Sequence, residues 1–448
     1  MAALALGPTI GGCRLHRGSA SAAPDTPPRL VPLPERPVDA VVVGAGVAGL
    51  AAARDLVAAG RTVIVVEARD RVGGRVYTDR SLARVPVERG AELIHGSNVS
   101  TWELVREVGV GTVRMGAERD DTPDSAQGNP ATIDLARVPP PAAQENAADY
   151  LRRVGLDPDR WPEPVQELEL DNEPMRRWSA AELVRLGYIG GDGGGSDDGR
   201  DFRVLGGYEQ LLRPLVDAVD VALECVVTQI DYSDSGVAVH CVTKTGKHTV
   251  RGRVCVVSLP IGVLRHGDVA FSPALPLQHL QAIGTVAAAD VAKLIYCFDQ
   301  PVLPARFAAI VNRTTNPPYF WTSSRGLSSF AGEVVVGWAA GDEARALLRL
   351  GDDGAVQAGL DTLRSAVGDG GLSPVRTAVH NWTSDPFARG AYSFVTPGMA
   401  NPAATLTQPV STVVFFAGEA TSTTDPTTVH GAYDTGRRAA RQALHALR

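Results

Sequence analysis

Three glycines and one glutamate have the residue types and the spacing of a site that binds phosphate and ribose. Gly44, Gly46 and Gly49 follow an apolar run with G-x-G-x-x-G spacing, and Glu67 ends the next apolar run. The first glycine permits a tight turn, the second lets the backbone approach a pyrophosphate, and the third lets a helix pack closely on the strand. A carboxylate at the tip of the second strand can accept hydrogen bonds from a ribose.

The sequence also predicts the elements that must position these residues. The β-branched run 38–43 predicts a buried strand, small residues from about 47 to 59 predict a helix, and Gly60 is a typical helix stop. The run 62–66 predicts the second strand. The helix N-terminus would then direct its unpaired N–H groups at the phosphates. Together these features indicate dinucleotide binding, and a strand–helix turn without a ligand is the alternative.

Length and composition set the class of protein. The chain has 448 residues, of which 44% are hydrophobic and 21% charged, as expected for a globular protein of two or three domains. The net charge of −7 gives no basic footprint for nucleic acid. Five cysteines form no C-x-x-C pair, so we expect no metal site and no disulfide framework. No apolar run is long enough to predict a membrane span.

The first 37 residues are expected to be a disordered tail, because six prolines lie between 24 and 37. The segment IGGC at 10–13 has a weak similarity to a lipoprotein cleavage site. We therefore expect a cytoplasmic protein, with a lipoprotein or secretion signal as the alternative. We expect a monomer or a homodimer.

Other residues stand out in their surroundings. Lys293 lies within an apolar, strand-like run, where a lysine needs a partner or a task unless its end reaches the surface. Glu92 and His95 lie in a short apolar segment, although a lone histidine is more often structural. Gly418 and Glu419 follow a late apolar strand and precede a loop and a helix, which offers a second helix N-terminus.

With these segments in hand, the chain resembles the flavin-dependent amine oxidases, a family that includes polyamine oxidases, monoamine oxidases and flavin histone demethylases. It is most similar to the polyamine oxidase branch. The resemblance rests on blocks that occur in order: GAGVAGL at 44–50, VGGR at 72–75, GAELIHG at 90–96, LGGYEQL at 205–211, VVSLPIGVL at 256–264, AKLIYCF at 292–298, W-x-x-D-P at 382–386 and FAGEATS…TVHGAY-x-x-G at 416–436.

The resemblance implies an α/β fold in which a discontinuous, Rossmann-like FAD-binding domain carries an inserted α+β substrate domain. The FAD-binding domain would comprise 38–97, 203–265 and 381–448. The substrate-binding domain would comprise 98–202 and 266–380.

The resemblance also implies FAD as cofactor and names its contacts. Arg69, Arg75 and the Gly74 backbone would approach phosphate or ribityl groups, and Val227 would present its backbone to adenine. Glu419 would reach the ribityl–phosphate arm and Val429 the isoalloxazine. The full expected set is Gly44, Gly46, Ala48, Gly49, Glu67, Ala68, Arg69, Gly74, Arg75, Ala91, Glu92, Val227, Trp382, Gly418, Glu419 and Val429.

For the substrate side, the resemblance implies that Lys293 is the catalytic residue and holds a water against flavin N5. The residues expected to line the substrate are His95, Glu92, Tyr392 and Thr428. Monoamine oxidases attach the flavin to a cysteine just before a tyrosine, but Ala391 precedes Tyr392 here. FAD is therefore expected to be non-covalent. Thr428 stands where monoamine oxidases place a second aromatic wall.

The expected reaction oxidises the C–N bond of an amine to an imine by hydride transfer to flavin N5, and O2 then reoxidises the flavin to give hydrogen peroxide. A polyamine is the leading small-molecule substrate. The alternatives are a tailoring oxidase acting on an amine or amide, and an L-amino-acid oxidase in which Arg313 or Arg325 grips a carboxylate. A flavin-binding scaffold without turnover is less favoured. The demethylase branch carries large added domains that 448 residues do not provide.

Overall fold

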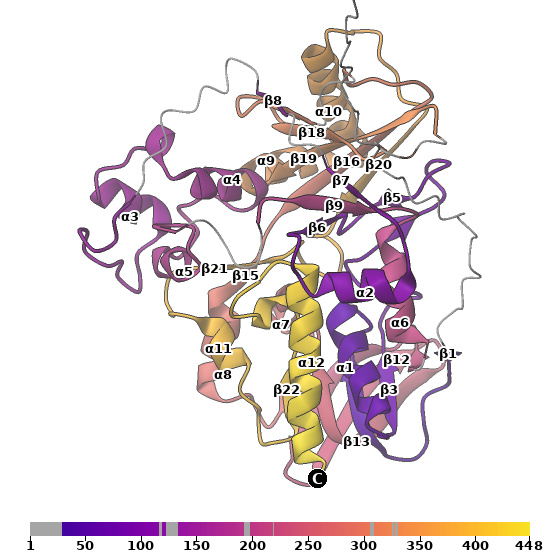
Figure 1. Ribbon diagram of the computed structural model, residues 1–448. Coiled ribbons are helices and arrows are strands. Elements are labelled where there is room, and N and C mark those ends of the chain that lie inside the picture. Colours follow the sequence, from indigo (N-terminus) through magenta and orange to yellow (C-terminus); the bar gives the residue numbers. More distant parts are fainter. Residues whose placement is uncertain are drawn as a thin grey trace, which may run out of the picture.

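The computed structural model describes residues 29–115, 119–121, 133–191, 198–217, 219–304, 309–324, 327 and 330–448. The chain forms two lobes (Figure 1). One contains the paired helices α1 (Val47–Ala58) and α12 (Val429–Ala446). The other contains β16 (Val291–Phe298) beneath α10 (Gly351–Val367).

A nine-stranded sheet forms the centre of the first lobe. Its strands run in the order β1-β10-β3-β2-β13-β12-β11-β14, and β22 also pairs with β13. The part from β1 to β13 is parallel, as a Rossmann-like core requires. The strands are β1 (Arg29–Leu30), β2 (Val38–Val43), β3 (Val63–Val66), β10 (Asp220–Ala222), β11 (Val226–Ser233), β12 (Gly236–Thr243), β13 (Gly246–Val257), β14 (Ala270–Ser272) and β22 (Val414–Phe416).

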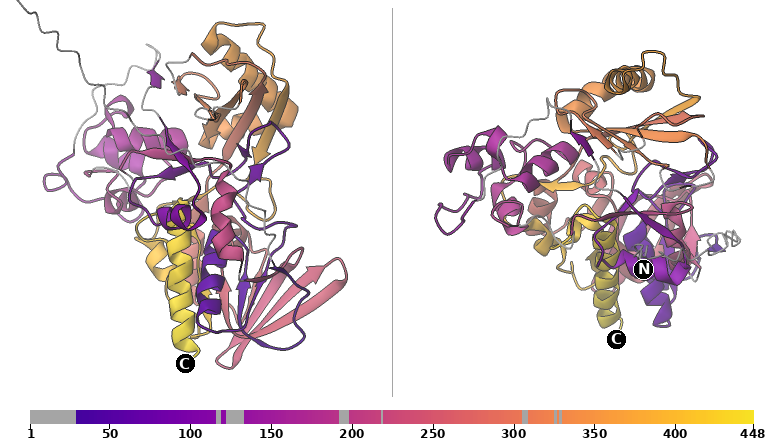
Figure 2. Two further views of the ribbon diagram at one scale, coloured as in Figure 1. Left: turned by 45° about the vertical axis from the view of Figure 1, so that its right-hand side comes forward. Right: turned by 45° about the horizontal axis from the view of Figure 1, so that its top comes forward.

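One face of this sheet is covered by α1 and α12, which lie side by side in Figure 1. Small residues let them approach closely, since a Cβ added at Gly436 of α12 would lie 2.1 Å from the Ala48 carbonyl oxygen of α1. Residues 261–283 and 395–420 contribute to the core on the other face, through α8 (Leu277–Thr285) and α11 (Pro402–Leu406) among others. The antiparallel meander β11–β13 extends from the body of the lobe (Figure 2, left, pink strands).

A six-stranded sheet, ordered β20-β16-β19-β18-β17-β8, forms the second lobe. Alternate residues of β16, such as Leu294 and Tyr296, pack against α9 (Gly341–Leu348) and α10. Because side chains alternate along a strand, Lys293 and Ile295 face the first lobe. The remaining strands are β8 (Arg119–Asp121), β17 (Ala309–Val311), β18 (Tyr319–Thr322), β19 (Glu333–Ala340) and β20 (Arg376–Asn381).

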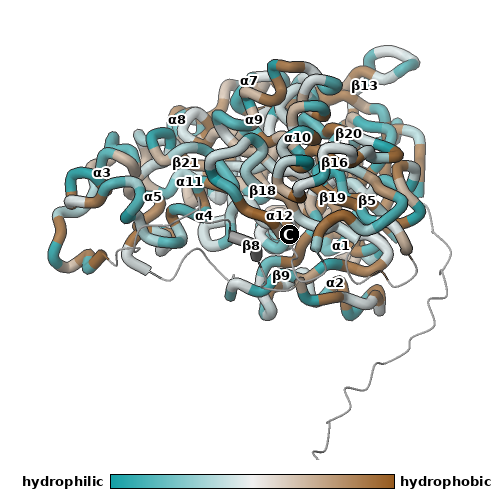
Figure 3. Tube along the Cα trace, turned by 90° about the horizontal axis from the view of Figure 1, so that it is seen from above, coloured by the Kyte–Doolittle hydropathy of each residue, from teal (hydrophilic) through white to brown (hydrophobic). Residues whose placement is uncertain are grey.

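Shorter elements connect the two lobes. A three-stranded sheet, ordered β6-β9-β7, lies between them (Figure 1). Helices α3, α4 and α5 lie on the side away from β13 (Figure 3). The bounds are β4 (Thr78–Asp79), β5 (Val87–Glu88), β6 (Leu93–His95), β7 (Thr112–Arg114), β9 (Asp201–Val204), β15 (Val286–Ala288), β21 (Ser393–Val395), α2 (Thr101–Val108), α3 (Ala147–Arg153), α4 (Glu163–Asp171), α5 (Ala180–Arg185), α6 (Arg213–Val216) and α7 (Ile261–His266). Short 3₁₀ turns span η2 (Pro158–Arg160), η3 (Tyr208–Leu212) and η4 (Glu419–Thr421).

The expected disordered tail of residues 1–37 needs correction at its end. Arg29–Leu30 form β1, which pairs in parallel with β10, and the Val31 N–H donates to the Val221 carbonyl at 3.1 Å. The edge of β10 offers backbone groups that the tail can satisfy. Residues 1–28, including the IGGC segment, lie outside the described part of the chain. Across the described residues, no helix has both the length and the apolarity needed to cross a bilayer.

Candidate functional site

The glycine-rich turn leaves open space at the start of α1. Gly44 has φ +101°, which favours glycine, and a Cβ added at Gly49 would lie 2.0 Å from the Gly44 carbonyl oxygen. A Cβ added at Gly46 would meet nothing within 4 Å. The helix has no side-chain N-cap and no acidic residue in its first turn. Its first N–H groups are therefore available to an anion.

Glu67 lies buried at the tip of β3 and fixes this turn. Its carboxylate accepts hydrogen bonds from the Ala45 N–H at 2.7 Å and the Arg69 N–H at 2.9 Å. Burial raises the pKa of Glu67, and the two backbone donors oppose that rise. Each carboxylate oxygen has a second lone pair, so the group can still accept from a ribose hydroxyl.

Residues 72–75 form a second loop against the first. The Gly73 N–H donates to the Ala45 carbonyl at 2.8 Å, and a Cβ at Gly74 would lie 3.3 Å from Gly46 Cα. Arg75 Nη1 donates to Glu419 Oε1 at 2.9 Å and to the Ala391 carbonyl at 2.7 Å. The loop therefore joins the N-terminal turn to the C-terminal strand–Gly–Glu segment.

Glu419 is the buried centre of that C-terminal segment. It also accepts from Ser393 Oγ at 2.6 Å and from the Thr427 N–H at 3.0 Å. A Cβ added at Gly418 would meet nothing within 4 Å. Val429 opens α12, and Thr428 caps this helix by accepting from the Gly431 N–H at 2.9 Å.

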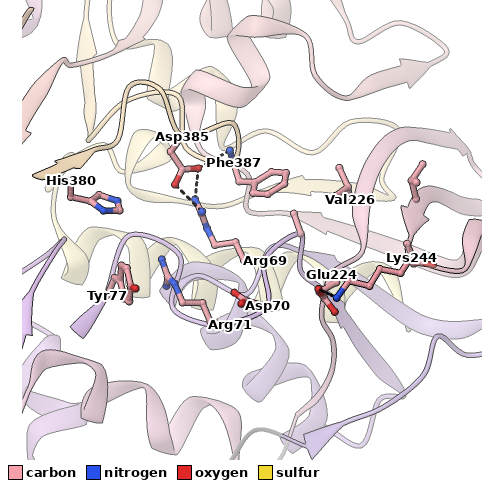
Figure 4. Close-up of a pocket in the computed structure, with 13 residues that line it drawn as sticks. Arg69, Asp70, Arg71, Tyr77, Glu224, Val226, Lys244, His380, Asp385 and Phe387 are labelled. Atoms are coloured by element: carbon pink, nitrogen blue, oxygen red, sulfur yellow. Dashed lines mark hydrogen bonds and ion pairs between the residues drawn. The ribbon is translucent and has the colours of Figure 1, made fainter. Parts of the chain in front are cut away.

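A cavity of about 570 Å³ opens beside the tip of β3 (Figure 4). Ala68 and Arg69 line it together with Val226 and Phe387. The Arg69 guanidinium makes two hydrogen bonds of 2.8 Å with Asp385 rather than pointing into open space. Val227, expected at the adenine, is the buried neighbour of Val226 on β11. The cavity thus borders the expected adenosine end of the cofactor site.

Lys293 and Glu92 form a buried ion pair at the other end of the site. Lys293 Nζ donates to Glu92 Oε2 at 2.8 Å and to the Gly90 carbonyl at 3.1 Å. The Lys293 and Glu92 side chains are only 2% and 5% exposed. Burial raises the pKa of Glu92, but the Lys293 and Arg203 charges outweigh it and hold the pKa at about 2. Glu92 is therefore ionised.

Aromatic rings surround this pair. Trp338 lies opposite Lys293 in the β16–β19 register, so both side chains face the first lobe. The Trp338 and Tyr392 rings are nearly parallel, at 20°, with centroids 6.5 Å apart. Trp321 lies 5.8 Å from both Trp338 and Lys293 Nζ, measured to the ring centroids. Trp382 packs in the same apolar cluster as Trp338 and Tyr392.

Trp382 and Tyr392 each donate a hydrogen bond to the backbone of a neighbouring segment. Trp382 Nε1 donates to the Arg89 carbonyl at 3.2 Å, next to Gly90. A Cβ added at Gly90 would lie 1.9 Å from the Arg75 carbonyl oxygen and 3.1 Å from the Trp382 ring. Ala91, expected at the cofactor, follows Gly90. The Tyr392 hydroxyl donates to the Asp171 carbonyl at the end of α4.

His95 and Arg313, one of the two arginines proposed for carboxylate binding, make other contacts. His95 on β6 is half-exposed, and its Nδ1 bonds to Asp201 at 2.7 Å. Arg313 Nη1 donates to the Gln166 carbonyl at 3.1 Å. Arg325 lies outside the described residues.

Sequence reasoning missed four residues of this site. Arg203, Trp321, Trp338 and Asp385 contact residues that lie far from them along the chain. Asp385 stands in the W-x-x-D-P block, which gave a signal for it. The other three reach the site through strand register alone, which one sequence does not fix.

The geometry suits a flavin dinucleotide. Open space lies at Gly46 and Gly418, where a Cβ would meet nothing, and the first of these adjoins an uncapped helix N-terminus. Arg75 and Glu419 connect this region to the aromatic cluster around Lys293. Among the described residues, no group of three or more His, Cys, Asp or Glu side chains is arranged to hold a metal ion.

Comparisons with known proteins agree with this geometry. The family model described as flavin containing amine oxidoreductase matches residues 47–183 and 180–444. Lysine-specific histone demethylase 2 of Homo sapiens is 28% identical in an alignment that covers 89% of this chain and 52% of that protein. Polyamine oxidase 4 of Oryza sativa subsp. japonica is 28% identical in an alignment that covers 92% of this chain and 90% of that protein.

Solved structures have the same fold. Cyclohexylamine oxidase from Brevibacterium oxydans superposes with a TM-score of 0.76 at 22% identity, covering 92% of this chain and 100% of that one. Wild-type putrescine oxidase bound to putrescine gives a TM-score of 0.76 at 20% identity, covering 92% and 99%. These similarities confirm the predicted two-domain α/β fold.

Proposed function

The chain belongs to the flavin containing amine oxidoreductase family, and we propose that it oxidises a polyamine or another small primary or secondary amine. It is an FAD-dependent amine oxidase. The substrate, the peroxide product and the role of each residue are our proposal.

We assign the FAD-binding part of the chain to 38–97, 203–265 and 381–448. The substrate-binding part is 98–202 and 266–380. The nine-stranded sheet continues past residue 265 through β14, which pairs with β11.

The chain would hold FAD along a continuous path. The α1 N-terminus and the loop 72–75 would bind the pyrophosphate, Glu67 the ribose, and Arg75 and Glu419 the ribityl–phosphate arm. Ala391 supplies no thiol beside Arg75, so no thioether to the flavin can form there. When bound, FAD supplies the acceptor for a hydride equivalent from the carbon beside nitrogen and returns the electrons to O2.

The observation that carries the proposal is the apolar, aromatic surrounding of Lys293. Trp338 and Tyr392 present nearly parallel faces whose centroids are 6.5 Å apart. Thr428 caps α12 and cannot supply a second aromatic ring beside the substrate. We assign that role to Trp338. Such a setting excludes water and favours the neutral amine, whose nitrogen lone pair helps the adjacent C–H bond to break. The two rings orient the substrate carbon.

Lys293 would hold a water molecule through its remaining N–H. An ammonium has three donors, of which two are bound to Glu92 and the Gly90 carbonyl. A water held at the third can receive or supply a proton without a strong base in the slot. It is also available for hydrolysis of the imine product.

Three features favour a polyamine. The relatives include a polyamine oxidase, and a neighbouring structure holds putrescine. The net charge of −7 suits a cationic substrate. We assign His95 and Asp201, which are both partly exposed, as polar partners for the distal amine of the substrate. The chain spans about half the length of the first demethylase relative, so any activity of such a larger protein is likewise only a proposal here.

The test is peroxide release by the purified yellow protein with spermidine, N-acetylspermine, benzylamine and L-phenylalanine. We expect turnover with the first two and little with the others. Activity on L-phenylalanine alone would replace the polyamine with an amino acid. Activity on benzylamine alone would indicate a tailoring oxidase of small amines. Failure of every amine to bleach the flavin without oxygen would leave only a flavin-binding scaffold.

A further inference from the structure

Glu92 lies at the centre of a buried charge cluster. Lys293 Nζ binds its Oε2 at 2.8 Å, and Arg203 Nη2 binds its Oε1 at 3.1 Å. Trp321 Nε1 donates to the same Oε1 at 3.1 Å. The three donors come from β16, β9 and β18, so three strands converge on one carboxylate. Two cations and one anion leave the cluster with a formal charge of +1.

The segment that carries Glu92 is held firmly. Gly90 cannot accept a side chain, because a Cβ there would lie 1.9 Å from the Arg75 carbonyl oxygen. The Arg89 carbonyl accepts from Trp382 Nε1, and the Gly90 carbonyl accepts from Lys293. The carboxylate therefore has a fixed position relative to Arg75 and Trp382, two residues assigned to the flavin.

Both oxygens of Glu92 are engaged, which argues against direct contact with the substrate amine. Oε2 binds the Lys293 ammonium, and Oε1 binds Arg203 and Trp321. A substrate ammonium beside it would have to compete with two buried cations in a cluster that is already positive. Glu92 is thus better suited to hold Lys293 than to bind the amine.

We propose that Glu92 is the positioning residue of Lys293: it fixes the ammonium in place and supplies the negative charge that faces it beside the flavin. The proposal rests on the proposed function in one respect, namely that Lys293 faces the flavin. It assigns Glu92 no contact with substrate or reacting atoms.

The charges around Glu92 determine what its removal does. Lys293 and Arg203 face it directly, and the buried Glu88 of β5 is a third ionisable group close enough to interact. With Glu92 neutral, Lys293 shares a buried site with Arg203 and lacks an anion of its own. Burial and a neighbouring like charge both disfavour the ammonium, so Lys293 would lose its proton at a lower pH.

The test is the midpoint potential of the bound flavin in Glu92→Gln as a function of pH, with a chemical reductant in place of substrate. The wild-type profile across pH 6 to 10, which includes the titration of Glu88 near pH 7, is the reference. In Glu92→Gln the potential should lie above the wild-type value at the acid end, because the cluster is more positive there. It should then fall through an inflection as Lys293 deprotonates.

Two further variants make the outcome specific to the pair. Glu92→Gln combined with Lys293→Met should lose the inflection. Glu88→Gln is the matched control: it replaces the other buried carboxyl of the same chain segment, which binds Thr78 and a backbone N–H instead of a cation. It should leave the potential unchanged at pH 6, where a carboxyl with a pKa of about 7 is mostly protonated and the substitution removes little charge. If Glu92→Gln does not fold, Glu92→Asp tests the same contact and should show an inflection near the alkaline end.

A Glu92→Gln or Glu92→Asp profile that superposes on the wild type would overturn the proposal. An inflection that is absent from the wild type, present in Glu92→Gln and still present in the double variant would also overturn it. Because reduction is chemical, this result is independent of the substrate. If no amine bleaches the flavin but Glu92→Gln shows the inflection, the substrate proposal fails and the role of Glu92 stands. At saturating amine, we expect the flavin of Glu92→Gln to be reduced at least about tenfold more slowly than the flavin of the wild type.

Discussion

Lys293→Met removes the ammonium while keeping a chain of similar length and apolar character. The Glu92 carboxylate then loses one of its three side-chain donors and keeps the other two, Arg203 and the Trp321 N–H. The substitution therefore separates two effects that the structure assigns to Lys293: its part in the reaction, and its contribution to holding a buried carboxylate.

The size of the second effect follows from the pKa of Glu92. Against burial, Lys293 and Arg203 lower that pKa from 4.5 to about 2. A difference of about 2.5 units, at about 1.4 kcal/mol each, stabilises the folded protein by about 3 kcal/mol at neutral pH. Because the folded pKa is the lower one, this contribution is present above about pH 4.5 and is lost as the pH falls toward 2. Lys293→Met removes one of the two cations beside Glu92, so it should lower the free energy of unfolding at neutral pH by about 1 to 2 kcal/mol.

Two assays check these expectations on the holoenzyme. The variant should remain yellow and melt a few degrees lower at neutral pH, and the difference from wild type should narrow as the pH falls below about 4.5. Reduction by spermidine without oxygen should slow at least about tenfold, or about 1.4 kcal/mol in the barrier. Unchanged reduction and reoxidation rates would remove Lys293 from the mechanism, and an unchanged melting temperature would refute the energetic reasoning on Glu92.

Other predictions concern the cofactor turn, the aromatic wall and a second buried acid. Gly46→Ala should fold normally but weaken FAD binding at least about tenfold by flavin titration, because its Cβ would fill space beside the helix N-terminus. Gly49→Ala should instead lower the melting temperature of the flavin-free protein, because its Cβ would lie 2.0 Å from the Gly44 carbonyl oxygen; equal effects of the two would contradict this distinction. Trp338→Ala should reduce kcat/KM for spermidine about tenfold or more and leave FAD affinity intact, whereas an unchanged kcat/KM would remove the ring from the slot. Burial raises the pKa of Glu88 to about 7, so stability should fall as the pH rises from about 4.5 through 7; melts of Glu88→Gln at pH 5 and 8 should lack this fall.

The cofactor half of the site could be anticipated because its signals are local. Gly44, Gly49 and Glu67 act within a single strand–helix–strand unit, so their spacing alone restricts the backbone they can form. The parallel strands β2, β3, β13 and β22 of the nine-stranded sheet follow from the same logic, since each ends in or consists of a buried apolar run. The family resemblance supplied the C-terminal Glu419, which lies far from Arg75 along the chain yet binds it directly.

The substrate half of the site could not be predicted in the same way, because its contacts depend on strand register and on pairing between distant segments. Nothing in the run containing Trp338 states that it lies opposite Lys293, because a shift of one residue would turn its ring to the other face. Glu92 was expected at the substrate, and its partner Arg203 could not be foreseen from a strand distant in sequence. The substrate-lining role of His95 stays a prediction. The short strand β1 was missed because its partner β10 comes much later in the chain.

The central claim is that an amine reduces FAD in the slot beside Lys293, and the most direct measurement mixes the yellow protein with spermidine in the absence of oxygen and records the flavin absorbance. The account predicts full bleaching in wild type and bleaching at least about tenfold slower in Lys293→Met. Bleaching by spermidine at the same rate in both proteins would contradict it.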